Sequence, residues 1–437
     1  MEQGKHTVRS RLAAAAYRLP RTGGGAGSQE GNPEAAGRLD KQAVLLLIVQ
    51  SLHGIATALS GTFVPVYLWK ASQSFSAIGW FTLSQHLISG LTFWLVGKWV
   101  KEYNKMNSLR AGVVLSGLFY SSVLLLGKQA AQYVVLLGML NGVALGFFWM
   151  AYNVVYFEIT EPDNRDRFNG WAGLLGSGAG IVAPWLSGLV IGLMSGDRGY
   201  RIIFTVSLVI FGIATLLSFF LARRESVGKY EWLYGFRELG RERSLWRSVT
   251  PALFMQGMRE GVFMFLLGLL VFLSTGREQS LGNFTFWTSL VGLMSFLLIG
   301  RRLNPRNRSK AMFVGTAILA ASTTLLLAGT EFYTLLTLGV AIAVFMPLYV
   351  IPMTSAVFDM IGSTKESAVH REELIVLREA ALITGRSVGL IIFLAVVAAT
   401  DSKTALTWLL IAIGAAPLPA WLFMRKLLTR SAGRRPV

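Results

Sequence analysis

The sequence predicts an all-α membrane protein, and three observations support that fold class. Hydrophobic residues make up 53% of the 437-residue chain and charged residues only 15%, which is too apolar for a soluble protein of this length. Apolar stretches of about 18 to 25 residues recur, and a helix of that length crosses about 30 Å of hydrocarbon. Basic residues gather in the connections on one side of these stretches. A topogenic signal therefore explains the net charge of +18 without nucleic acid binding.

Twelve stretches are long enough to span a bilayer. In chain order they are 43–69, 77–97, 109–126, 133–157, 169–192, 202–222, 249–273, 283–300, 311–329, 333–360, 379–400 and 404–424. The longest connection between them mixes charge with aromatic residues, so we expect it to lie along the membrane surface as an amphipathic linker. The predicted organisation is a disordered cytoplasmic tail (1–40), a six-helix bundle (41–222), this linker (223–248), a second six-helix bundle (249–424) and a basic cytoplasmic tail (425–437).

The distribution of basic residues predicts the orientation. With the N-terminus inside, the inner loops and tails hold 33 of the 41 Lys and Arg residues, and the outer loops hold six. This asymmetry is typical of multi-pass proteins, and it places both termini in the cytoplasm of a cell whose plasma membrane the chain spans. The two remaining basic residues, Arg259 and Arg386, lie inside predicted spans.

The two sets of six helices resemble each other in sequence. Polar residues and loop glycines of the first set recur in the second at a nearly constant offset of 201 to 206 positions. Paired repeats are how many transporters place a binding site at the interface of two halves. The matched positions are Gln50 with Gln256, His53 with Arg259, Gly97 with Gly300, and Glu158 with Asp359.

Two loops carry a resemblance to the major facilitator superfamily that covers residues 41 to about 428. The family motif G-x-L-a-D-r-x-G-r-k corresponds to "GKWVKEYNKM", which keeps Gly97 but has Lys101 in place of the Asp. A second copy, "GRRLNPRNRSK", keeps Gly300 and Arg301. The resemblance implies two six-helix bundles around a central cavity, transport by alternating access, and a cytoplasmic latch formed by these loops. The alternative is that both loops only set the topology.

The resemblance also implies roles for acidic residues and prolines. Glu158 corresponds to an acid that pairs with the motif bases, and Asp359 is its repeat partner. The stretch "AGIVAPWLSG" resembles the antiporter motif and contains Pro184, although close packing of small residues explains it equally well. Independently of any family, Pro347 and Pro352 predict a bent tenth helix that is suited to a gate.

Ionisable residues inside the predicted spans are the candidate site. Arg259 lies ten residues into its span, near the bilayer midplane, and His53 lies at the same depth in the first span. Since a charge in the membrane is costly unless it is paired or used, we predict substrate contacts, preferably to an anionic group. The predicted substrate-binding residues are Gln50, His53, Gln256, Arg259 and Arg386. The alternatives are a purely structural pair, such as Glu260 with Arg386, and a satisfied core histidine for His53.

Enzymatic functions have little support in the sequence. It contains no Walker-type phosphate loop, no G-x-S-x-G element and no histidine spacing typical of a metal site, and it has no cysteine. We therefore expect no cofactor and a secondary transporter, acting as a monomer, that exports a small anionic or amphiphilic molecule. Coupling to protons would use Glu260 or His53, with Na⁺ as an alternative ion. A nutrient importer and a non-transporting receptor or assembly factor remain alternative functions.

Overall fold

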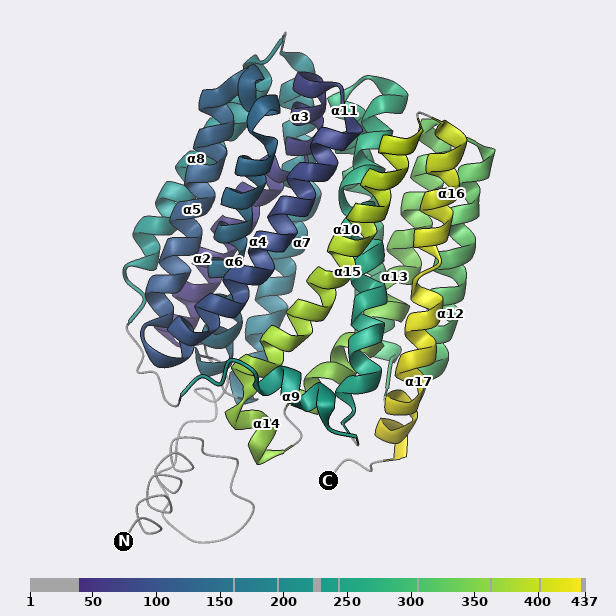
Figure 1. Cartoon of the computed structure of the whole chain (residues 1–437). Helices are drawn as coiled ribbons and strands as arrows, with labels where there is room; N and C mark the ends of the chain where they lie inside the picture. The colour runs from purple at the N-terminus through teal and green to yellow at the C-terminus, as the bar shows by residue number, and fades with distance from the viewer. Residues whose placement is uncertain are drawn as a thin grey trace, which may run out of the picture.

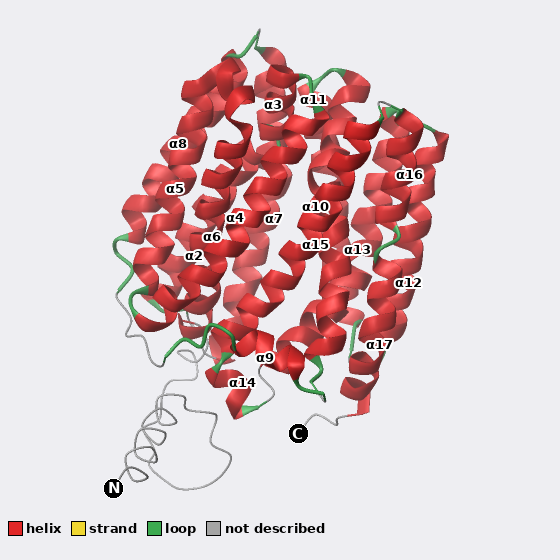
Figure 2. Ribbon diagram, viewed as in Figure 1, coloured by secondary structure: helices red, strands yellow, loops and turns green. Residues whose placement is uncertain are grey.

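The structure is a computed structural model that describes residues 39–159, 162–194, 196–222, 229–242, 244–304, 306–361, 364–400 and 402–433. Within these ranges every regular element is helical (Figure 2). The first group, which we call the N-half, comprises α2 (Lys41–Gly61), α3 (Val64–Ser72), α4 (Phe75–Glu102), α5 (Lys105–Leu126), the 3₁₀ helix η1 (Gly127–Tyr133), α6 (Val134–Ile159), α7 (Pro162–Leu193) and α8 (Arg198–Ser218).

A short helix, α9 (Tyr234–Gly240), belongs to the linker and precedes the second group, which we call the C-half. The C-half comprises α10 (Trp246–Thr275), α11 (Glu278–Arg302), α12 (Arg308–Ser322), the 3₁₀ helix η2 (Thr323–Ala328), α13 (Phe332–Ile361), α14 (Lys365–Val369), α15 (Arg371–Ala399), α16 (Lys403–Gly414) and α17 (Pro417–Gly433). Figure 1 shows the two halves side by side, with the long helices roughly parallel.

The prediction of a multi-pass helical membrane protein is confirmed. Ten segments in the described part of the chain are long and apolar enough to cross a bilayer. One of them, Lys105–Tyr156, contains α5 and most of α6, and the 28-residue α4 is not among the ten. The count of twelve spans stays a prediction. The predicted tail 1–40 falls almost wholly outside the described residues, as do 223–228 of the linker.

Two helix ends differ from the predicted spans. The eleventh span was expected to begin at residue 379, but α15 begins at Arg371. Its extra first turns contain two buried glutamates, which hydropathy alone counts against a membrane helix. At the other end of the chain α17 continues to Gly433, into the segment expected to be a tail.

The two ends of the bundle carry different short helices. Figure 1 places α9 and α14 at one end, which we call the linker end, and α3 at the opposite end, which we call the far end. The halves meet along two pairs of helices, α4 with α15 and α7 with α11. The interface between the halves therefore runs from one end of the bundle to the other.

Glycines bring several helix pairs into backbone contact. A Cβ atom at Gly257 of α10 would lie 2.0 Å from the backbone oxygen of Leu382, and one at Gly385 of α15 would lie 2.0 Å from that of Phe254. Only glycine permits such an approach, which is common in membrane helix packing. As a result, polar side chains on α10 and α15 lie close enough to contact each other.

Candidate functional site

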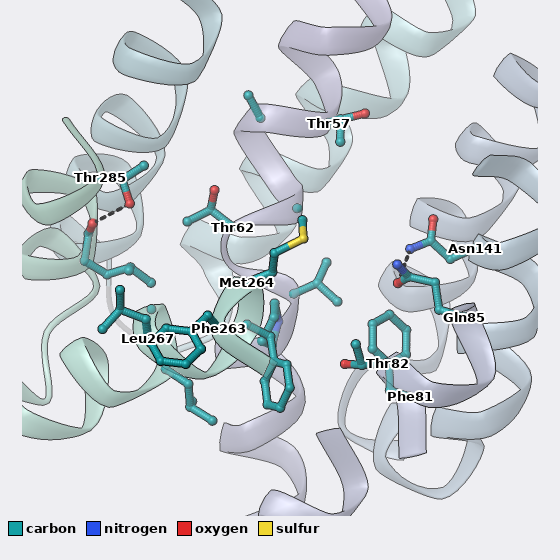
Figure 3. Close-up of a pocket in the computed structure, with 18 of the residues that line it drawn as sticks. Thr57, Thr62, Phe81, Thr82, Gln85, Asn141, Phe263, Met264, Leu267 and Thr285 are labelled. Atoms are coloured by element: carbon teal, nitrogen blue, oxygen red, sulfur yellow. Dashed lines mark hydrogen bonds between the residues drawn. The ribbon is translucent and has the colours of Figure 1, made fainter. Parts of the chain in front are cut away.

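A cavity of about 550 Å³ lies between the two halves, in the part of the bundle nearer the far end. The N-half supplies most of its polar lining, including Thr82, Gln85 and Asn141. Across the cavity, the C-half supplies an apolar wall that includes Phe263, Met264 and Leu267 (Figure 3). The lining residues include no Asp, Glu, Lys or Arg. The cavity therefore suits a molecule with an apolar body and neutral hydrogen-bonding groups.

The polar side of the cavity is built by close packing of α4 on α6. A Cβ atom at Gly142 would lie 2.5 Å from the backbone oxygen of Gln85, and one at Gly138 would lie 2.1 Å from Ser84 Oγ. This approach brings two amide side chains together, and Asn141 Nδ2 donates to Gln85 Oε1 at 2.9 Å. Figure 3 shows the two amide groups joined at one side of the cavity.

The N-half residues predicted to bind substrate lie behind this cavity. Gln50 Oε1 accepts a hydrogen bond from the Tyr152 hydroxyl at 2.6 Å. His53 is 3% exposed, its Nε2 lies 3.3 Å from Ser116 Oγ, and its ring stacks on Phe148 at 3.6 Å between centroids. Neither Gln50 nor His53 is among the lining residues. His53 therefore has the surroundings of the satisfied core histidine that the sequence left open.

The C-half residues form a charged group on α10 and α15. Glu260 Oε2 accepts from Arg386 Nη2 at 2.7 Å and from Arg386 Nε at 3.2 Å. Gln256 Nε2 donates to the other carboxylate oxygen at 2.6 Å. This ion pair is the structural alternative expected from the sequence. Close glycine packing of α10 on α15 explains why two residues 126 positions apart meet.

Arg259 has no carboxylate partner among the described residues. It is 3% exposed, and its Nη1 has only the sulfur of Met346 as a hydrogen-bond partner, at 3.7 Å. Nε and Nη2 have no partner in the part of the chain that the structure describes. The guanidinium lies over the ring of Phe263, 4.7 Å from its centroid, and Phe263 lines the cavity. A guanidinium without a carboxylate hydrogen-bond partner in the described part of the chain is thus one aromatic ring away from the candidate site.

An ion-pair cluster joins the halves at the linker end, and we call it the linker-end lock. Lys101 Nζ, on α4, donates to both carboxylate oxygens of Glu373 on α15, at 2.6 and 2.8 Å, and lies 3.6 Å from Glu372 Oε2. It also donates to the backbone oxygen of Val369 at 3.1 Å. The side chain of Lys101 is only 4% exposed.

The linker hydrogen-bonds to both helices that this lock joins, α4 and α15. The backbone N–H of Tyr230 donates to Glu102 of α4 at 2.9 Å, and that of Glu231 donates to Glu373 of α15 at 3.0 Å. Tyr230 packs directly on α4, where a Cβ atom at Gly97 would lie 2.8 Å from its hydroxyl. Burial, with the nearby carboxylate of Glu373, raises the pKa of Tyr230, so its hydroxyl stays protonated.

A second ion pair joins the halves at the far end, and we call it the far-end lock. Lys70 Nζ, on α3, lies 2.7 Å from Glu278 Oε1 on α11. The Tyr200 hydroxyl, on α8, donates to the same oxygen at 3.0 Å, and Lys70 lies over the Tyr200 ring, 5.2 Å from its centroid. The Lys70 side chain is 40% exposed and that of Glu278 is 10% exposed. Each end of the interface between the halves is thus closed by a lysine from the N-half and a glutamate from the C-half.

Comparison with known proteins decides the family. The sequence profile of the Major Facilitator Superfamily matches residues 46–369. The chain belongs to the major facilitator superfamily. It is 41% identical over 360 residues to "Uncharacterized protein YqgE" of Bacillus subtilis (strain 168), an alignment that covers 82% of this chain and 84% of that one.

Solved structures of low sequence identity share the major facilitator fold. A point mutant of the nucleoside transporter NupG superimposes with a TM-score of 0.68 at 12% identity, covering 89% of this chain and 100% of that one. A bacterial homologue of the iron transporter ferroportin, in its inward-facing state, gives a TM-score of 0.64 at 15% identity, covering 90% and 99%. At these identities the likeness shows the fold alone.

Within this superfamily fold, the gating residues expected from the resemblance lie in different settings. Gly300 and Arg301, expected in a loop, are exposed in the last turn of α11, and Pro347 and Pro352 lie inside α13. Pro184 lies where α7 crosses α11, and its backbone oxygen would be 2.9 Å from a Cβ atom at Gly282. The side chain of Glu158 lies outside the described part of the chain.

The second motif copy does pair an acid with a base. Asp359 Oδ2, at the end of α13, lies 2.8 Å from Arg308 Nη1 in "GRRLNPRNRSK". This contact lies within the C-half, whereas Lys101 in the first copy pairs across the two halves. Replacing the motif acid by Lys101 is thus matched by a pair of acids, Glu372 and Glu373, on the facing helix.

Sequence reasoning missed several residues that the structure brings together. The far-end lock and the two amides of the cavity were not identified. One signal was present: Gln85 and His86 are adjacent polar residues in an otherwise apolar span, and both line the cavity. Likewise, Glu372 and Glu373 stand directly before an apolar stretch, where a helix N-terminus favours acidic residues.

Proposed function

We propose that this protein is a secondary transporter that moves a small amphiphilic molecule across the plasma membrane by alternating access. The observation that supports this most directly is the cavity of about 550 Å³ between the two halves, with an apolar wall facing neutral polar groups. Its volume is in the range of about 300 to 1,000 Å³ that is typical of small-molecule sites. An ion pair closes the interface between the halves at each end of the bundle, so opening either end requires breaking contacts between the halves.

A second feature favours an anionic group on the substrate. Two nitrogens of Arg259, Nε and Nη2, are unsatisfied in an apolar setting, and a guanidinium stays charged and binds two-oxygen acceptors with its planar fork. Reaching it requires the Phe263 ring to move, since that ring contacts both the guanidinium and the cavity. In this proposal Glu260 couples export to protons, because its protonation would free Arg386.

The orientation of the chain is part of the proposal, with the linker end and both termini in the cytoplasm. The sequence contains no cysteine, so single cysteines can be introduced at Ser244, near the linker end, and at Ser280, near the far end. An impermeant maleimide added to intact cells should label the Ser280→Cys variant only. Labelling of Ser244→Cys under these conditions would reverse the orientation.

Transport can be tested with reconstituted protein. Fluorescein is an anionic amphiphile, and proteoliposomes should show its counterflow, whereas liposomes without protein should not. Arg259→Lys should reduce that flux although it keeps the charge, and the exposed Arg302→Lys serves as the matched control. Equal flux in both variants would make Arg259 a structural residue. Absence of flux for anionic, neutral and cationic amphiphiles alike would favour a non-transporting receptor.

Coupling is tested in the same vesicles with a pH gradient. Glu260→Gln should abolish accumulation driven by the gradient but leave equilibrium exchange intact, because an amide resembles the protonated carboxyl group and has no proton to release. Persistent proton-driven accumulation in this variant would exclude Glu260 as the proton carrier. The role would then pass to His53 or to another ion.

A further inference from the structure

We propose that the Gln85–Asn141 pair recognises an uncharged edge of the substrate that carries one hydrogen-bond acceptor beside one donor, as the cis amide of an aromatic lactam does. The inference rests on the proposed transport function, because it assigns a substrate class to the same cavity. The amide pair contacts a different part of the ligand from the anionic group that is proposed to reach Arg259. It predicts selectivity among molecules of equal size and apolar area.

The amide pair leaves a defined set of free hydrogen-bonding groups. Asn141 Nδ2 donates to Gln85 Oε1 at 2.9 Å, which uses one donor and one acceptor. The carbonyl oxygen of Asn141, an acceptor, and the amino group of Gln85, a donor, take no part in this hydrogen bond, and both residues line the cavity. A ligand with an acceptor next to a donor complements both at once.

This pattern does not depend on which way each amide is turned. If both amides were rotated, Gln85 would donate to Asn141, leaving the Gln85 oxygen as acceptor and the Asn141 amino group as donor. In either arrangement the pair offers one of each toward a ligand. A carboxylate has two acceptors and no donor, so one of its oxygens would face a carbonyl oxygen.

The pair is held in place by the backbone. Gly138, Gly142 and Gly146 line the face of α6 that packs on α4, and a Cβ atom at Gly146 would lie 2.6 Å from the side chain of Thr92. These contacts fix the spacing of the two helices, and the hydrogen bond between the amides restrains the two side chains. A pre-positioned pair loses little conformational entropy when a ligand binds.

The opposite wall selects the shape of the ligand body. Phe263, Met264 and Leu267 of α10 face the polar side across the cavity, and Phe81 lies one turn before Gln85 on α4 (Figure 3). Aromatic and thioether side chains pack well against flat apolar rings. A bicyclic aromatic lactam therefore places its amide edge on the amides and its hydrocarbon edge on α10.

Three bicyclic probes with one ring skeleton test the inference by calorimetric titration of the purified full-length protein. Isoquinolin-1(2H)-one has one acceptor and one donor, its 2-methyl derivative has only the acceptor, and protonated 1-aminoisoquinoline has two donors. The parent protein should bind the lactam about tenfold more tightly than either of the others, since a missing partner leaves a buried polar group unpaired.

A change of specificity makes the test decisive. Gln85→Glu keeps the size of the side chain but, with Asn141 still donating to it, presents two acceptors toward the cavity. This variant should lose its preference for the lactam and bind 1-aminoisoquinoline most tightly. Gln132→Glu makes the same substitution at an exposed residue outside the cavity lining, and it is the matched control. The control should retain the order of the parent protein.

The outcomes separate this inference from the proposed function. If all three probes bind the parent protein equally well, the cavity holds amphiphiles but the amide pair does not select among them, and the inference is wrong. If Gln132→Glu loses the preference as Gln85→Glu does, the selectivity does not come from the pair, and the inference is also wrong. If no probe binds, both the inference and the assignment of this cavity to the substrate are overturned.

Discussion

The two ends of the interface between the halves use the same pair of residue types in different surroundings. At the linker end, Lys101 is 4% exposed and is held by two carboxylates and a backbone oxygen. At the far end, Lys70 is 40% exposed and contacts one carboxylate oxygen, which it shares with the Tyr200 hydroxyl. The linker donates one backbone N–H to Glu373 of the first lock and another to the neighbouring Glu102, and no linker residue in the described part of the chain hydrogen-bonds to the second lock.

This difference indicates that the two locks stabilise the closed interface between the halves to different extents. Removing one partner of a buried, hydrogen-bonded ion pair costs about 3 to 5 kcal/mol, because the other charge is left desolvated. An exposed pair contributes about 0 to 1 kcal/mol, and the far-end pair is closer to this class because Lys70 is 40% exposed, although Glu278 is buried. We therefore expect the linker end to be the harder one to open. The far end, where the cavity lies, is expected to open at smaller cost.

The largest effect is expected for Lys101→Met, which leaves Glu372 and Glu373 buried without their cation. The linker end should open more often, and the midpoint of thermal unfolding in detergent should fall by more than in any other single variant of the locks. In a Thr62→Cys background, which reports on the cavity near the far end, labelling from that side should become slower. An unchanged unfolding midpoint would show that the linker-end lock does not stabilise the closed state.

A smaller loss of stability is expected when the charges of Lys101 and Glu373 are exchanged. The double variant Lys101→Glu with Glu373→Lys keeps an ion pair between the same positions and the same net charge in the cluster. It should recover at least half of the stability that Lys101→Glu alone loses, because the coupling of a close pair appears only in the double-mutant cycle. If the double variant loses as much stability as the two single variants together, these residues do not interact in the protein.

The smallest effects belong to the far end. Lys70→Met should cost about 1 kcal/mol, which corresponds to about a fivefold shift toward states open at that end. Labelling of Thr62→Cys from the far side should therefore rise about fivefold, the opposite sign to Lys101→Met. Tyr200→Phe removes only the hydroxyl bound to Glu278, so it should raise the labelling of Thr62→Cys by a smaller factor. A decrease in labelling for Lys70→Met would contradict the proposed opening of this end.

The membrane class and the superfamily could be predicted from the sequence because both depend on local patterns. Apolar stretches, the bias of Lys and Arg, and the loop motifs are each readable within about 30 residues. The place of Arg259 and Glu260 in the middle of a long helix was also readable, since position along a helix follows from residue counts. The departure at Lys101 was visible as well, and the structure shows what replaces the missing acid.

The lining of the cavity could not be predicted in this way. Membrane helices are apolar on every side, so the sequence does not say which face of a helix turns toward the other half. His53 and Gln85 are both polar residues in apolar spans, yet His53 stacks on Phe148 inside the N-half and Gln85 faces the cavity. The partners of the locks were equally hidden, because Lys70 and Glu278 are separated by 208 positions.

The crossing of α7 and α11 has a consequence for how the halves move. Gly188 and Gly282 bring these two backbones together, and a Cβ atom at Gly188 would lie 2.8 Å from the backbone oxygen of Glu278. Where α4 meets α15, a Cβ atom at Gly90 would instead approach only the side chain of Ile383. Side-chain contacts permit shear, whereas a backbone contact resists it. We therefore expect the crossing of α7 and α11 to act as a pivot when the halves move, while α4 and α15 slide past each other.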